Sequence, residues 1–141
     1  MTMTLSHAQT IAQTALAHAR TAKVRPLCVV VLDARSAVIA VASEDGTSLK
    51  RFEVAQGKAQ GALAFNMGSR ALGGMAVERP HFFAGVAHAV GGLVPVAGGV
   101  LIRDAVGAVI GAVGVSGDNS DNDEAAAVAG IKATGFVADG G

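Results

Sequence analysis

The sequence lacks tryptophan and tyrosine, and it has one cysteine among its 141 residues. That single thiol, Cys28, excludes an internal disulfide framework of the kind that stabilises many small secreted proteins. Five phenylalanines are the only aromatic residues, whereas half of the chain is hydrophobic. The core must therefore consist mainly of aliphatic side chains and alanine, packed closely together.

The chain also lacks a net charge, because eleven basic residues balance eleven acidic ones. Proteins that bind nucleic acids usually carry a basic face or a basic block, and the sequence has neither. We therefore expect no nucleic-acid partner. Charged residues make up only 16% of the chain, which leaves little polar surface for a small monomer. We expect part of the apolar surface to be buried in a homo-oligomer.

No stretch approaches the roughly 20 consecutive apolar residues that span a bilayer. The first residues, MTMTLSHAQTIAQTALAHAR, also differ from a signal peptide, because they lack a basic start and a continuous apolar run. We expect a cytoplasmic protein with no membrane partner. The length fits a single domain over residues 1–141.

Hydrophobic periodicity predicts helices that alternate with β-hairpins. Apolar residues at helical spacing predict a helix over residues 5–19, capped by Thr4 or Ser6, and another over residues 52–65. One hairpin joins LCVVVLD to AVIAVAS through the turn DARS, and a second joins GGVLIRD to GAVIGAVGVSG through DAVG. These elements predict an α+β domain with an antiparallel sheet of about five strands and covering helices.

The middle and the end of the chain are less regular. NMGSRALGGMAVERPHFF is predicted to form a short helix and loops, and GVAHAVGGLVPVAGG is expected to contain a strand bent or interrupted by glycine. DNDEAAAVAGIKATG predicts a final helix, with Asp121 or Asn122 as its cap and acidic residues in its first turn.

The segment GVSGDNSDNDEAAAVAG does not fit three motifs that it superficially resembles. Gly117 directly follows Ser116, so the nucleophile-elbow spacing is broken. A calcium loop that began at Asp118 would need glycine at its sixth position, where Asp123 stands. The glycines are spaced too widely and regularly for a dinucleotide-binding fingerprint. The segment is better explained as the turn by which a strand enters a helix.

The four histidines, His7, His18, His81 and His88, do not have the spacing of a stand-alone metal site. A single histidine is more often a surface or hydrogen-bonded side chain than a ligand, but any one of them can serve as an axial ligand to a macrocycle. His81 and His88 are the stronger candidates because they flank an aromatic and glycine-rich segment. Lys58 lies within an apolar helical stripe, where the sequence favours a solvated edge position.

Four segments together resemble the GlcG/HbpS-like family, which includes the C-terminal domain of PduO. They are VVVLDARSAVIAVASEDG, VAQGKAQGALAF, ERPHFFAGVAHAVGGLVPVAGGVLI and GAVIGAVGVSGDNSDNDEAAAVAGI. Lys58 and the alanine after it match the Lys-Ala pair of the family. Two segments depart from its pattern: Leu101 stands where relatives usually have proline, and Ser43 and Glu44 stand where relatives often have an arginine before Asp-Gly.

This resemblance implies a profilin-like domain that forms homo-oligomers and binds a small-molecule ligand. Heme is the first candidate for the ligand and cobalamin the weaker one. The third alternative is that the protein has no cofactor. A glycine-lined apolar cleft would hold the ring. The candidate residues for binding it are Lys58, His81, Phe83, His88, Gly98 and Gly99.

Two other functions are left open. The first is a small catabolic isomerase or tautomerase acting on a carboxylated metabolite, with Lys58, Asp123 and Glu124 as candidate catalytic residues. The second is a structural oligomer in which the glycines serve packing alone.

Overall fold

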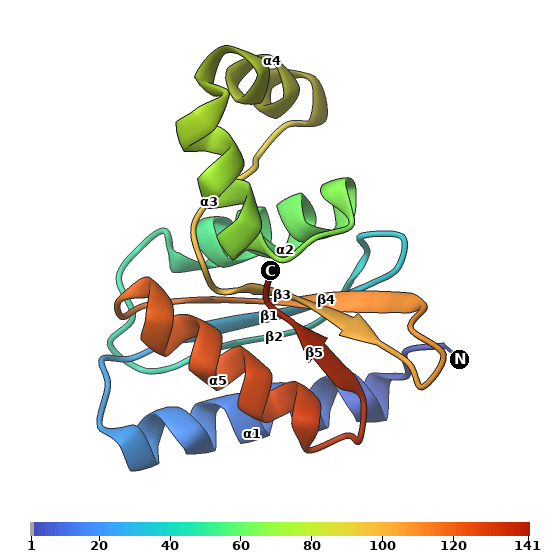
Figure 1. The fold of residues 1–141 in the computed structure, drawn as a ribbon. Coiled ribbons are helices and arrows are strands. Elements are labelled where there is room, and N and C mark those ends of the chain that lie inside the picture. Colours follow the sequence, from blue (N-terminus) through green and yellow to red (C-terminus); the bar gives the residue numbers. More distant parts are fainter. Residues whose placement is uncertain (1) are drawn as a thin grey trace.

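The computed structural model describes residues 2–141, which form five helices and five strands (Figure 1). The helices are α1 (Leu5–Ala22), α2 (Arg51–Phe65), α3 (Ser69–Glu78), α4 (Pro80–Val90) and α5 (Ser120–Lys132). The strands are β1 (Cys28–Asp33), β2 (Val38–Ser43), β3 (Gly99–Arg103), β4 (Val109–Ser116) and β5 (Val137–Asp139).

The five strands form one sheet in the order β2-β1-β4-β3-β5, and every neighbouring pair is antiparallel. The two predicted hairpins, β1–β2 and β3–β4, meet where β1 pairs with β4. The structure thus confirms the predicted α+β class and the antiparallel sheet. Side chains of β1 alternate between two cores: Val29 and Val31 face one, and Val30 and Leu32 face the other.

Helices cover both faces of the sheet. Figure 1 shows α1 and α5 side by side on one face and α2 on the opposite face. Helices α3 and α4 rise from α2 and project away from the sheet, and α4 packs mainly on α3. We call these two helices the α3–α4 arm.

The backbone of α2 lies against the sheet because glycines face it. A Cβ atom on Gly114 of β4 would lie 1.8 Å from the carbonyl oxygen of Ala55, and one on Gly99 of β3 would lie 2.3 Å from that of Lys58. On the other face, a Cβ atom on Gly130 of α5 would lie 2.5 Å from the carbonyl oxygen of Ile11 in α1. Small residues at these contacts are therefore a requirement of the packing.

In the middle of the chain, the short helix expected within residues 66–83 is present as α3, but the prediction of a strand after it was wrong. The segment expected to contain an interrupted strand forms α4 instead, and irregular backbone follows it up to β3. Pro80 is the first residue of α4, a position where its missing N–H breaks no helical hydrogen bond. Pro80 and Gly91, which broke the sequence pattern, here mark the start and the end of the same helix, α4.

Both ends of the chain also refine the prediction. Thr4 caps α1 and is one of the two caps predicted for that helix. Helix α5 is capped by the side chain of Asn119, which precedes the predicted caps Asp121 and Asn122. Strand β5 was not predicted. It has three residues and pairs with β3.

We predict that Gly114→Ala lowers the free energy of unfolding by at least about 2 kcal/mol, because the new methyl group must push α2 away from β4. Gly74→Ala is the matched control, since a Cβ atom there would meet nothing within 4 Å. As an alanine inside α3, it is expected to stabilise the chain by about 0.5–1 kcal/mol. Urea unfolding measures both variants. Equal changes in stability would contradict the packing described here.

Candidate functional site

Lys58 and Asp123 form a buried ion pair between α2 and α5. The exposed fractions of these residues are 2% and 1%, so the expectation of a solvated Lys58 was wrong. Its Nζ atom lies 3.1 Å from Oδ2 of Asp123 and donates a 2.9 Å hydrogen bond to the carbonyl oxygen of Val115. The other carboxylate oxygen of Asp123 accepts from the backbone N–H of Asp118 at 2.9 Å. The pair therefore joins α2, the end of β4 and the first turn of α5.

The predicted glycine pair packs directly on this lysine. A Cβ atom on Gly98 would lie 2.8 Å from Nζ of Lys58, and the φ angle of Gly98 is +120°. The N–H of Gly99 donates a 2.7 Å hydrogen bond to the hydroxyl of Ser69, which in turn donates to the carbonyl oxygen of Val96 at 2.6 Å. The structure thus brings Gly98, Gly99, Lys58 and Ser69 together as packed interior.

Burial lowers the pKa of the Lys58 ammonium and raises the pKa of the Asp123 carboxyl, because desolvation disfavours both charged forms. Their mutual attraction, and for Asp123 also the Asp118 N–H, oppose these shifts. In this conformation neither group can touch a dissolved molecule. Glu124, the third candidate catalytic residue, points away from the pair and binds Arg70 at 3.1 Å. No observation therefore favours the isomerase hypothesis, and the catalytic roles stay predictions.

The candidate histidines lie on α4, which projects away from the sheet (Figure 1), whereas Lys58 packs against the sheet. His81 and His88 are exposed and, seven residues apart, share one face of α4. Gly85 lies between them on this face, and a Cβ atom there would meet nothing within 4 Å. Phe83 is buried on the opposite face. The structure therefore separates the histidines from Lys58 and the glycine pair, and their ligand roles stay predictions.

A hollow of about 500 Å³ lies between the β1–β2 turn, α2 and the end of α4, and we call it the arm cleft. Its lining residues are Ala34, Arg35, Ser36, Gln60, Leu63, Ala64 and Val90. The amide of Gln60 donates to the carbonyl oxygen of Gly91 and so ties α2 to the base of the arm. The cleft combines an apolar wall with one cationic side chain.

Ser36 is the unusual residue of the arm cleft. Its φ angle is +65°, which is uncommon for a residue with a side chain. Within residues 2–141, its hydroxyl is the one buried side-chain polar atom without a hydrogen-bond partner. Arg35 beside it is held by Asp33, whose Oδ2 accepts from Nη2 at 2.9 Å. The sequence showed these residues only as part of the turn DARS, and nothing local indicated that the turn faces α2.

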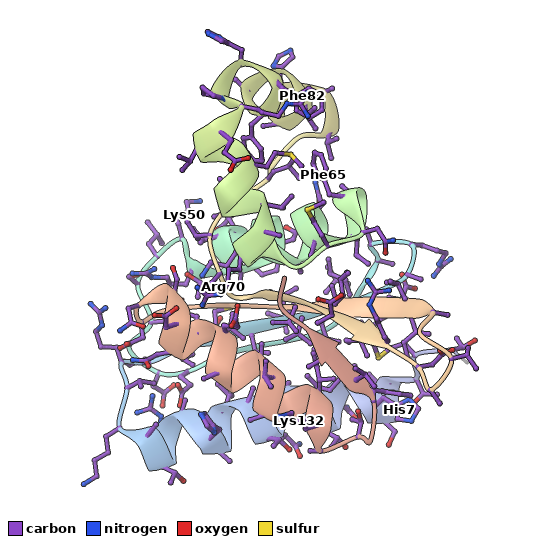
Figure 2. The ribbon with its side chains drawn as sticks, viewed as in Figure 1. His7, Lys50, Phe65, Arg70, Phe82 and Lys132 are labelled. Carbon is purple, nitrogen blue, oxygen red and sulfur yellow. The ribbon has the colours of Figure 1, made fainter. Side chains whose placement is uncertain are left out.

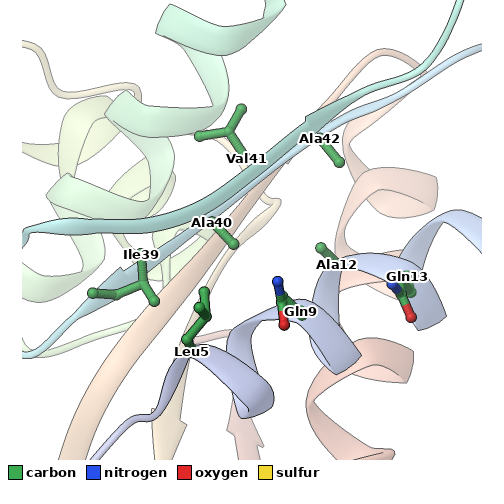
Figure 3. Close-up of a pocket in the computed structure, with 8 residues that line it drawn as sticks. All are labelled: Leu5, Gln9, Ala12, Gln13, Ile39, Ala40, Val41 and Ala42. Carbon is green, nitrogen blue, oxygen red and sulfur yellow. The ribbon is translucent and has the colours of Figure 1, made fainter.

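A second hollow, of about 410 Å³, lies between α1 and the edge strand β2 (Figure 3). Figure 3 shows Gln9 and Gln13 of α1 beside Ala40 and Ala42, while Val41 points to the other side of the strand. The lining has no charged side chain. This groove can bury apolar surface but offers no counter-charge to a carboxylate.

Two further features of the described part of the chain concern clusters of metal-binding side chains and membrane-spanning helices. Residues 2–141 contain no group of three or more His, Cys, Asp or Glu side chains placed to hold a metal ion. None of the helices in these residues combines the length and apolar character needed to cross a bilayer.

We predict that Lys58→Met lowers the free energy of unfolding by about 3–5 kcal/mol, because it leaves the Asp123 carboxylate buried without its partner. Adding Asp123→Leu should recover most of that loss. Lys50→Met is the matched control, since Lys50 forms only an exposed pair with Glu53 and should change stability by less than about 1 kcal/mol. Urea unfolding of all three variants measures the differences. A loss for Lys58→Met no larger than the control would rule out a stabilising role for the pair.

Comparison with known proteins identifies the family. A family model described as "Haem degrading protein HbpS-like" matches residues 3–132. The crystal structure of HbpS is 28% identical, with a TM-score of 0.82, and the alignment covers 94% of this chain and 90% of that one. A double mutant of HbpS from Streptomyces reticuli is 26% identical, with a TM-score of 0.82 and coverage of 94% and 87%.

A more distant structure, a complex of PduOC with heme, is 22% identical and has a TM-score of 0.85. The alignment covers 96% of this chain and 97% of that one, and at this identity it supports the fold alone. Among curated proteins, none matches the sequence. Because the family model spans nearly the whole sequence, and the predicted resemblance agrees with it, this chain belongs to the HbpS-like family of heme-related proteins.

Proposed function

We propose that this chain binds heme or a related tetrapyrrole in the arm cleft. The family description concerns heme, and one structural neighbour, PduOC, forms a complex with heme. The observation that carries the proposal is the lining of the cleft, where the side chain of Arg35 lies beside an apolar wall. A hollow of about 500 Å³ also lies within the size range of small-molecule sites.

Each part of the lining suits one part of a tetrapyrrole. Leu63, Ala64 and Val90 offer apolar surface to the ring. Arg35 binds Asp33 through Nε and Nη2, which leaves its Nη1 donors for a propionate. Bound heme would supply a metal centre. These residues would contact the edge of the ring and pair with the charge of its propionate.

We propose that a histidine of the arm, His81 or His88, is the ligand of the heme metal. Both side chains are open to solvent, and α4 ends at Val90 on the lining of the cleft. They lie on the face of α4 opposite to its buried residue Phe83, so they are accessible to a ring bound by the same copy or by a neighbouring one.

Titration of the apo-protein with hemin tests this proposal. We expect a saturable Soret band, and Arg35→Ala should weaken binding about tenfold, the loss expected from one charge-assisted hydrogen bond. Replacing both His81 and His88 by alanine should shift the Soret band, whereas His18→Ala, an exposed histidine on α1, should not. No saturable binding would refute the function. An unshifted band in the double variant would refute only the axial assignment.

We also propose that the arm packs against a second copy in a homo-oligomer. Its exposed apolar side chains include Val77 and Phe82, which are 82% and 42% exposed. Figure 2 shows Phe82 near the tip of the arm, away from the sheet. Exposed apolar surface on a projecting helix pair is typical of a protein interface.

Light scattering after size exclusion measures the oligomeric state. We expect Val77→Asp combined with Phe82→Asp to lower the molar mass, because two buried charges would disrupt an apolar interface. Val106→Asp is the control, since Val106 is 88% exposed in the β3–β4 turn, outside the arm. An equal molar mass for the double variant of the arm and for Val106→Asp would contradict an interface on the arm.

A further inference from the structure

We propose a second binding site, for a small oxyanion, at the start of β1. A pocket of about 160 Å³ opens there, and its lining residues are Arg25, Pro26, Gly46, Ser48, Arg51 and Gly117. We call it the arginine pocket. It lies before Cys28, at one end of β1, whereas the arm cleft lies beyond Asp33 at the other end. The two sites are therefore separate, and this inference does not depend on heme binding.

Arg51 is the central residue of the arginine pocket. Its Nε atom donates a 2.9 Å hydrogen bond to the hydroxyl of Ser48, and Nη1 donates to the hydroxyl of the buried Ser116 at 3.2 Å. Both acceptors are neutral. The two bonds orient the guanidinium and use two of its five N–H donors, so three donors are available to a ligand.

The neighbouring cations each have a carboxylate partner, but Arg51 has none. Arg25 pairs with Asp118 at 3.2 Å, Lys58 pairs with Asp123 at 3.1 Å, and Lys50 approaches Glu53 at 3.9 Å. In residues 2–141 no carboxylate forms an ion pair with Arg51. One positive charge at the wall of this pocket is thus uncompensated.

The backbone adds to this positive field. Arg51 is the first residue of α2, and the helix starts without a side-chain cap. The N-terminus of a helix carries a partial positive charge and favours anions, so a cation is unfavourable there unless an anion accompanies it. The charge of Arg51 also lowers the pKa of Lys58, after the larger effect of burial. An anion in the pocket would relieve both repulsions.

The size and donors of the pocket define the ligand class. A volume of about 160 Å³ admits a single carboxylate or phosphate group but not a macrocycle. Arginine guanidinium groups bind both kinds of oxyanion through paired N–H donors. The two arginines and Ser48 supply donors at the rim. The pocket therefore suits the anionic group of a small metabolite, or the free ion.

The test is a titration of the full-length ¹⁵N-labelled protein with sodium phosphate and, separately, sodium acetate, at constant ionic strength set by chloride. We expect saturable shifts of the amide signals of Gly46 and Gly117, which line the pocket. Arg51→Gln should weaken this binding at least tenfold. Arg103→Gln, on β3 and outside the lining of this pocket, is the matched control and should leave it unchanged.

Ser48→Leu is a second variant, which blocks the pocket without removing a charge, and it should also abolish the shifts. Saturation by phosphate alone would assign the site to phosphate, and saturation by acetate would extend it to carboxylates. No saturable shift with either anion would overturn the proposal. So would shifts that persist in a folded Arg51→Gln or Ser48→Leu variant.

Discussion

The close contact between the backbone of α2 and the sheet is the constraint on which the rest of this structure depends. Gly99 and Gly114 provide no side chain at the contact, so the carbonyl oxygens of α2 approach the strands directly. This approach brings Lys58 to the end of β4, where its ammonium reaches Val115 and Asp123. A larger residue at either glycine would separate the helix from the sheet and break this connection.

The same constraint explains where the hollows of the two proposed sites lie. The sequence suggested a cleft beside these glycines, but α2 fills the space next to them. No room is left there for a ring at the centre of the sheet. The arm cleft and the arginine pocket instead lie at opposite ends of β1, where turns meet α2. Each presents an arginine from a turn or a helix start. The central packing therefore leaves its hollows, the two proposed sites, at its periphery.

Local patterns predicted the parts of the fold that are locally determined. The two hairpins and α1 have clear periodicity with turn or capping residues, and the structure has all of them. Strand β5 was not predictable, because three residues form a strand only by pairing with β3. Lys58 was misplaced for a related reason: its burial depends on Asp123, which lies 65 positions later. Nothing in its own helix indicates that partner.

Hydrogen–deuterium exchange of Gly114→Ala tests the central contact most directly. If α2 is held by its approach to Gly114, the amides of α2 should lose more protection than those of α1 and α5, which cover the other face of the sheet. In the unmodified chain, the amides of α2 should be as protected as those of β1. An equal loss over all helices, or no loss in α2, would contradict the account.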